Sequence, residues 1–221
     1  MKTAIIVGAT GAIGTELLTL LLKAPEYSHV HCLVRRPMAI SHSKLITHEI
    51  NFDEWDIQPL INAHPTLMHA QVFCCLGTTL KQAGSIDAFK RIDSDYVLAV
   101  ASLAETISAE GFSLVSALGA NANSSNYYTQ TKGDVESKVQ QYQLSSIRIF
   151  RPSLLHGKRN TFRLGEYIGL ILLTLISPLL QGKLKKYRAI SITQVAKALY
   201  LSSLEPPQKL TFFESNDIQQ F

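Results

Sequence analysis

The sequence predicts an α/β fold in three layers, with helices on both faces of a mostly parallel sheet of about seven strands. Short, continuously apolar runs alternate along the chain with segments of helical periodicity. Strands that are buried on both faces give such continuous runs, and parallel strands require right-handed crossovers that cover both faces. The length of 221 residues suits one full domain.

Glycine, proline or polar residues bound each expected element, as they do at strand and helix ends. The strands are expected at 4–7, 30–34, 45–50, 71–76, 112–115, 147–150 and 210–213. The helices are expected at 13–22, 87–109, 127–142 and 193–203, with a short helix or loop at 55–63.

The composition excludes several classes of protein. Hydrophobic residues make up 46% of the chain, which is too many for a disordered protein. The net charge of +4 is too small to indicate a nucleic-acid binder. The three cysteines form no CxxC pair and the apolar run near the N-terminus is too short for a signal peptide. We therefore expect a cytoplasmic protein with no nucleic-acid partner and no transmembrane segment.

A glycine-rich loop joins the first expected strand to the first expected helix. Gly8, Gly11 and Gly14 form the pattern GxxGxxG. In that place the first glycine allows a tight turn, the second lets the backbone approach a pyrophosphate, and the third lets helix and strand pack closely. The phosphates then meet the helix N-terminus, which favours anions. The loop predicts a Rossmann-type dinucleotide site; the alternative is a tight turn without a ligand.

Two arginines and no acid stand at the end of the second expected strand. Sites that prefer NAD usually carry an acid about 20 residues after the glycines, where it binds the ribose 2′-hydroxyl. Arg35 and Arg36 occupy this region instead, and arginine forms strong charge-assisted hydrogen bonds to phosphate. We therefore expect NADP, as NADPH, to be favoured over NAD. The alternative is two solvated surface arginines.

A tyrosine and a lysine are spaced for proton transfer. Tyr128 and Lys132 lie four residues apart on an expected helix, so they share one face. A nearby ammonium favours the phenolate form of a tyrosine, whose ordinary pKa is about 10. Tyr127 lacks such a partner, and the alternative is a surface tyrosine above a solvated lysine. Ser116 ends the fifth expected strand and could donate a hydrogen bond to a substrate carbonyl.

Further stretches combine with these motifs to indicate a family. They are Cys75-Leu76-Gly77-Thr78-Thr79, 89–97, 116–120, 124–126, 128–133 and 150–153. Over nearly its whole length the chain resembles the short-chain dehydrogenase/reductase superfamily, and more narrowly its atypical branch of Tat-interacting protein 2 oxidoreductases and their bacterial relatives.

The resemblance implies a seven-stranded Rossmann sheet, NADP(H) binding and a catalytic set of Ser116, Tyr128 and Lys132. The implied cofactor contacts are Gly8, Thr10, Gly11, Ala12, Ile13, Arg35, Arg36, Leu76, Gly77, Thr78, Tyr128, Lys132 and Pro152. One departure is evident. Many members add a catalytic asparagine from the long helix after the fourth strand, and no asparagine occurs between Ser85 and Gly111.

The domain is expected to span 1–221, with a nucleotide-binding core over about 1–155. A small substrate-side lobe and the last strand would follow over about 156–221. Its most apolar stretch, 168–180, is shorter than the ~20 residues of a membrane span, so we expect a buried or groove-lining helix.

Two functions are consistent with these features. The first is an NADP(H)-dependent oxidoreductase that transfers hydride between nicotinamide and a carbonyl or alcohol, with Tyr128 as the proton donor. Its partner would be a small molecule, and the apolar stretch at 168–180 suggests a hydrophobic one. The alternative is a non-catalytic NADP(H)-binding redox sensor or regulatory or assembly protein. The oligomeric state stays open, with a homodimer as one candidate.

The remaining candidates are weaker. His156, Arg159 and Arg163 follow the sixth expected strand and could contact substrate, although ordinary loop residues have the same appearance. The seven histidines lack the spacing of metal ligands, so no metal is expected. The basic run at 183–188 has the character of a solvated loop.

Overall fold

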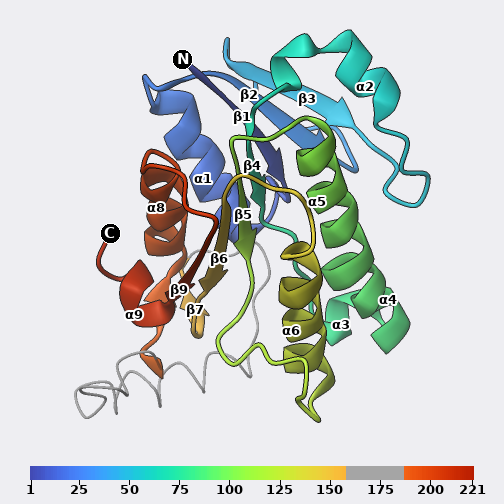
Figure 1. Ribbon diagram of the computed structural model, residues 1–221, viewed down its shortest axis with the longest axis vertical. Coiled ribbons are helices and arrows are strands. Elements are labelled where there is room, and N and C mark those ends of the chain that lie inside the picture. Colours follow the sequence, from blue (N-terminus) through green and yellow to red (C-terminus); the bar gives the residue numbers. More distant parts are fainter. Residues whose placement is uncertain (158–186) are drawn as a thin grey trace.

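The computed structural model describes residues 1–157 and 187–221. Seven strands form one sheet in the order β3-β2-β1-β4-β5-β6-β9, and every neighbouring pair is parallel (Figure 1). The strands are β1 (Lys2–Val7), β2 (Tyr27–Val34), β3 (Leu45–Glu49), β4 (Gln71–Cys74), β5 (Gly111–Val115), β6 (Ile147–Arg151) and β9 (Leu210–Glu214). The predicted parallel sheet of about seven strands is confirmed.

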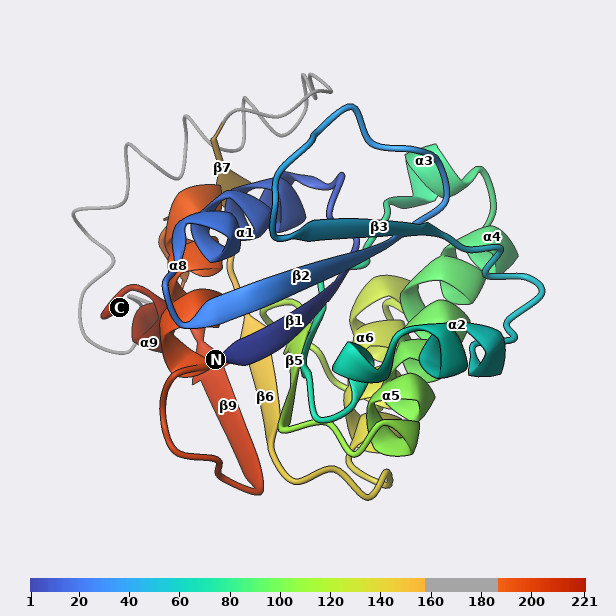
Figure 2. The same cartoon turned by 90° about the horizontal axis from the view of Figure 1, so that it is seen from above.

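Helices cover both faces of this sheet (Figures 1 and 2). On one face α1 (Ala12–Lys23) packs beside α8 (Ile192–Ser202), and on the other α5 (Tyr96–Thr106) packs beside α6 (Tyr127–Val139). The shorter elements are α2 (Gln58–Ala63), a 3-10 turn (Pro65–Leu67), α3 (Leu80–Ala83), α4 (Ile86–Lys90), a π-helical turn (Arg91–Asp95), α9 (Ser215–Ile218), β7 (Leu155–His156) and β8 (Ile190–Ser191).

Strand β1 explains why the central strands are apolar throughout. Ile5 and Val7 belong to the core under α5 and α6, whereas Ala4 and Ile6 belong to the core under α1 and α8. All four side chains are fully buried, because successive strand residues point to opposite faces and both faces are covered.

The strand order places a ligand site. The chain leaves β1 toward β2 on one side and returns to β4 on the other, so the loops after β1 and β4 diverge. Ligands of open α/β sheets bind in such a crevice, outside the carboxyl ends of the strands.

The prediction of one continuous helix over 87–109 is wrong in detail. It is divided into α4, the π-helical turn and α5, because the extra residue of a π turn interrupts regular helical winding. It ends at Thr106, shortly before Ser108 adopts a φ of +49°. The strand expected at 71–76 ends at Cys74, and the next two residues, Cys75 and Leu76, border a pocket.

The C-terminal part is only partly described. Strand β9 completes the main sheet and α8 packs against α1. The stretch 168–180, Arg159 and Arg163 lie outside the described residues, as does most of the basic run, so the expected substrate-side lobe stays a prediction. Within 1–157 and 187–221, no helix has both the length and the apolar character that crossing a membrane requires.

Candidate active site

The glycine loop makes a tight turn between β1 and α1. Gly8 has a φ of +88°, and a Cβ there would lie 2.6 Å from the carbonyl oxygen of Cys75. A Cβ on Gly14 would lie only 2.1 Å from the Gly8 oxygen. Gly11 begins α1 without a side-chain cap, so the first backbone N–H groups of the helix stay available. The tight turn and the close helix approach both require glycine.

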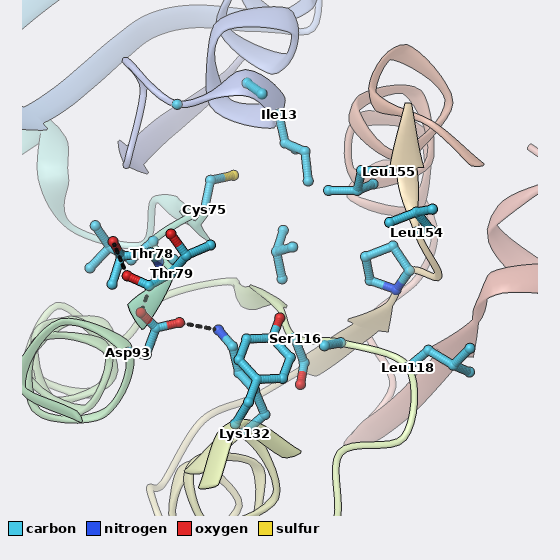
Figure 3. A pocket seen from close by; sticks show the side chains of 18 of the residues that line it. Ile13, Cys75, Thr78, Thr79, Asp93, Ser116, Leu118, Lys132, Leu154 and Leu155 are labelled. Atoms are coloured by element: carbon cyan, nitrogen blue, oxygen red, sulfur yellow. Dashed lines mark hydrogen bonds and ion pairs between the residues drawn. The ribbon is translucent and has the colours of Figure 1, made fainter. Parts of the chain in front are cut away.

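A pocket of about 910 Å³ opens beside this loop at the carboxyl ends of β4, β5 and β6 (Figure 3). Its volume lies within the range of about 300–1,000 Å³ that is typical of small-molecule sites. The structure brings eleven of the expected site residues to its wall, namely Thr10, Gly11, Ala12, Ile13, Leu76, Gly77, Thr78, Ser116, Tyr128, Lys132 and Pro152.

Three expected cofactor residues do not line this pocket. Gly8 shapes the turn of the glycine loop through its positive φ and its close approach to Cys75. Arg35 and Arg36 directly follow β2, next to the glycine loop of neighbouring β1, and both are exposed. Their place agrees with the expected end of the second strand, and their contact with a nucleotide stays a prediction.

Lys132 forms a buried ion pair at the floor of the pocket. Its Nζ lies 2.8 Å from Oδ1 of Asp93, and both side chains are almost completely buried (Figure 3). The other carboxylate oxygen, Oδ2, accepts a hydrogen bond of 2.8 Å from the backbone N–H of Thr78. Burial opposes the charged form of Lys132, but Asp93 and the nearby Tyr128 outweigh it and raise the lysine pKa above its ordinary value.

Ser116 donates its hydroxyl proton to a carboxylate rather than to the pocket. Its Oγ lies 2.5 Å from Oε1 of Glu136, which is 2% exposed. Arg151 holds the same carboxylate through Nε and Nη2 and also pairs with Glu214 at 2.9 Å. Because the Ser116 hydroxyl proton is directed to Glu136, the expected donation from Ser116 to a carbonyl is not formed in this structure.

Tyr128 is placed by the start of α6. The side chain of Asn126 caps this helix by accepting from the N–H groups of Tyr128 and Thr129. Tyr128 lines the pocket half-buried, with its ring centroid 5.8 Å from that of Phe89. Tyr127 instead packs edge-on against Phe89 and is not part of the described pocket wall. Tyr128 therefore faces the described pocket and Tyr127 does not, and the catalytic role of Tyr128 stays a prediction.

Asp93 and Glu136 are the functional candidates that the sequence analysis missed. The sequence indicates both acids, because each lies four residues from other members of a buried helix face. Asp93 lies between Phe89 and Val97, and Glu136 follows Lys132 by four residues.

Three histidines gather on the face of the sheet near α2, and none of them lines the described pocket. His31 Nδ1 and His48 Nε2 are joined by a hydrogen bond of 2.8 Å, and the ring of His64 lies 4.6 Å from that of His48. Burial and the neighbouring rings lower the pKa of His31 and of His48 to about 4. No group suited to a metal ion is found in the part of the chain that the structure describes. His156 lies in β7, beside Ser191 of β8, and does not line the described pocket.

Known proteins resemble this chain in sequence. Protein HTATIP2 of Rattus norvegicus is 36% identical over 168 residues, which are 76% of this chain and 68% of that protein. A Scheffersomyces stipitis protein named FMP52-1, mitochondrial, is 33% identical over 160 residues, which are 72% of this chain and 70% of that protein. No family model matches the chain.

Solved structures share the fold at low identity. MoeE5, solved with UDP-glucose and NAD, superposes with a TM-score of 0.69 at 13% identity, over 98% of this chain and 79% of that one. A short-chain dehydrogenase family protein from Francisella tularensis gives a TM-score of 0.64 at 12% identity and covers 98% of both chains. These likenesses confirm the Rossmann-type fold.

Proposed function

The chain belongs to the family of HTATIP2 and FMP52 proteins, which has the NAD(P)-binding fold of short-chain dehydrogenases/reductases, and we propose that it is an NADP(H)-dependent oxidoreductase. It would transfer hydride between the nicotinamide and a carbonyl or alcohol substrate. One observation carries the proposal: Ser116, Tyr128 and Lys132 line the same pocket as the glycine loop.

The residues at the start of α1 and in the loop after β4 support the binding of a dinucleotide. Thr10, Gly11, Ala12 and Ile13 lie at the start of α1, where free N–H groups would hold the phosphates. Lys132 would hold the hydroxyls of a ribose, and the neighbouring Gly77 and Thr78 would border the cofactor. When bound, the nicotinamide supplies or accepts the hydride.

The side chains divide the proton chemistry between them. The Tyr128 hydroxyl would give its proton to the substrate oxygen during reduction and take it back during oxidation. Lys132 would support the ionised form of Tyr128 through its charge. Because the Ser116 proton is held by Glu136, Ser116 would present oxygen lone pairs to the pocket and leave Tyr128 as the proton donor.

The direct test is a screen of aldehydes and ketones with NADPH. We expect Tyr128→Phe to lower the turnover of an accepted carbonyl by at least about 100-fold, the effect of losing a general acid. Tyr127→Phe is the matched control, because this neighbouring ring lies outside the described pocket wall, and it should retain activity close to wild type. Equal activity of wild type and Tyr128→Phe would rule the mechanism out.

We further propose that NADP is preferred over NAD. The exposed guanidinium groups of Arg35 and Arg36 follow β2 and would pair with a 2′-phosphate. The double variant Arg35→Asp/Arg36→Ala should weaken the binding of NADPH much more than that of NADH, as calorimetric titration can measure. Lys23→Ala, an exposed cation at the other end of α1, should change neither affinity. Equal losses for both nucleotides would contradict the preference.

The described wall beside the catalytic side chains favours an apolar substrate. Leu118, Leu154 and Leu155 line this part of the pocket (Figure 3). The side chain of Ser153 is already bonded to the Arg188 carbonyl and to Ser215. Aliphatic walls contribute binding through apolar area removed from water. The carbonyl screen should therefore include a series of increasing alkyl length, with the KM expected to fall along it.

The alternative function is an NADP(H)-binding regulatory or sensor protein without turnover. The capture of the Ser116 proton by Glu136 is the observation that favours it, because Ser116 is then no donor to a carbonyl. It would bind NADPH tightly, reduce no carbonyl in the screen, and change its affinity for a protein partner with the cofactor.

Localisation in the cytoplasm stays a prediction from the sequence. The names of the fungal FMP52 relatives include the word mitochondrial, which favours a different compartment for those proteins. Fractionation of cells that express the chain would decide between the two.

A further inference from the structure

We propose that Asp93 is a positioning residue that fixes the Lys132 ammonium and, through its negative charge, favours the oxidised over the reduced nicotinamide cofactor. This inference rests on the proposed cofactor binding. It concerns a residue on the long helical segment after β4, where the sequence offers no asparagine.

The π-helical turn brings Asp93 to the pocket. Phe89, Asp93 and Val97 all have 0% exposure, so the carboxylate occupies a position on the otherwise apolar face that α4 and α5 turn to the core. π-helical turns interrupt longer α-helices, and they are frequent at functional sites. An acid on such a face requires partners, because an unpaired buried carboxylate is strongly unfavourable.

Asp93 has a partner on each of two elements that border the pocket. Its Oδ1 faces Nζ of Lys132 on α6, and its Oδ2 accepts from the backbone of Thr78 in the loop after β4. A Cβ placed on Gly77 would lie 3.7 Å from Oδ1 and 3.9 Å from Nζ, so this loop passes directly over the ion pair. Asp93 thereby joins α6 to the loop that would meet the cofactor.

Stability alone is a weak reason for such a pair. The loss of hydration can exceed the attraction when two opposite charges are buried together. Lys132 and Asp93 also lie at the wall of a pocket, not in the middle of a core. Their charges therefore act on whatever binds there.

The charges have a chemical consequence for a nicotinamide cofactor. The ring carries one positive charge in NADP⁺ and none in NADPH. An uncompensated Lys132 would repel the oxidised ring, and Asp93 cancels this repulsion. The ratio of the two dissociation constants, Kd(NADP⁺)/Kd(NADPH), should therefore depend on the net charge of the pair.

A charge cycle tests this at pH 6.5, with Kd values for NADP⁺ and NADPH and a parallel set for NAD⁺ and NADH. Asp93→Asn should raise the ratio and Lys132→Gln should lower it, each by about fivefold, the size expected for one charge acting through several ångströms of partly polar protein. The double variant Asp93→Asn/Lys132→Gln should return the ratio to within about twofold of wild type. Asp95→Asn, the same change at an exposed position of the same turn, should leave it unchanged.

The outcomes separate the proposals. A ratio that moves in the same direction in both single variants, or that is not restored in the double variant, overturns the role of Asp93 while cofactor binding stands. If Asp93→Asn does not fold, comparing Lys132→Gln with the double variant still isolates the carboxylate charge, and equal ratios there overturn the inference. A wild-type protein that binds none of the four nucleotides overturns the proposed function and this inference together.

Discussion

Two buried polar clusters lie on opposite sides of the crevice between the loops after β1 and β4. One cluster is charged and the other is neutral. At the pocket, Lys132 and Asp93 are buried as full charges and pair at 2.8 Å. Under α2, His31 and His48 are buried as neutral rings joined by one hydrogen bond. Lowered histidine pKa values keep that second cluster uncharged at neutral pH.

A charged pair at a pocket and a neutral cluster within the fold should respond differently to change. A charged pair must keep both partners, because loss of one leaves the other buried and unpaired. A neutral cluster tolerates substitution better but becomes costly when protons bind to it. We therefore expect the pocket cluster to respond most strongly to mutation and the histidine cluster to respond to pH.

The largest effect is expected from Lys132→Met. This change leaves the fully buried Asp93 carboxylate without its cation and should lower the free energy of unfolding by about 3 kcal/mol or more. Urea denaturation at pH 7 measures it. Lys138→Met, at an exposed position of the same helix, should change stability little. A loss below about 1 kcal/mol for Lys132→Met would show that the charged pair is not needed for stability.

A smaller effect is expected from acid on the histidine cluster. The folded pKa of about 4 for His31 and His48 lies below the unfolded value of about 6.5, so the unfolded chain binds more protons between these values. Stability from this source is complete above pH 6.5 and is lost as the pH falls toward 4. Through these two rings, the free energy of unfolding should fall by about 2 kcal/mol between pH 7 and pH 5.5.

Urea denaturation at both pH values measures this loss. His48→Gln should remove about half of it, whereas His42→Gln in an exposed loop should retain it. An identical pH dependence in wild type and His48→Gln would contradict the assignment.

The smallest effect is expected at Glu214. This residue ends a series of contacts that runs from Ser116 through Glu136 and Arg151. Glu214 pairs with Arg151 but is 32% exposed, and exposed ion pairs add little. Glu214→Gln should therefore lower the free energy of unfolding by less than about 0.5 kcal/mol. Glu136→Gln should cost several times more, because this carboxylate is buried and serves both Ser116 and Arg151. Equal losses would remove the distinction between the two ends.

The sequence predicted the parts of the molecule that depend on local chemistry. Continuous apolar runs predicted the strands, and the glycines predicted the loop after β1, because backbone approach there excludes every side chain. The four-residue spacing of Tyr128 and Lys132 predicted their shared face, and both line the pocket.

The remaining features depend on contacts between distant segments. Asp93 and Lys132 lie 39 positions apart, and a periodic pattern does not reveal which acid meets which lysine. The hydrogen bond of Ser116 depends on Glu136, 20 positions along the chain, which Arg151 of β6 holds in place. The π-helical turn was missed because one extra residue in a turn barely changes the helical pattern.

The most direct test of the central claim is deuterium transfer to a carbonyl substrate in a single turnover, from NADPH that carries deuterium at both C4 positions of the nicotinamide ring. We expect deuterium on the former carbonyl carbon of the product, with a rate at least about 100-fold slower in Tyr128→Phe. A wild-type protein that binds NADPH but transfers no deuterium to any carbonyl offered would contradict the enzymatic account and favour the regulatory alternative.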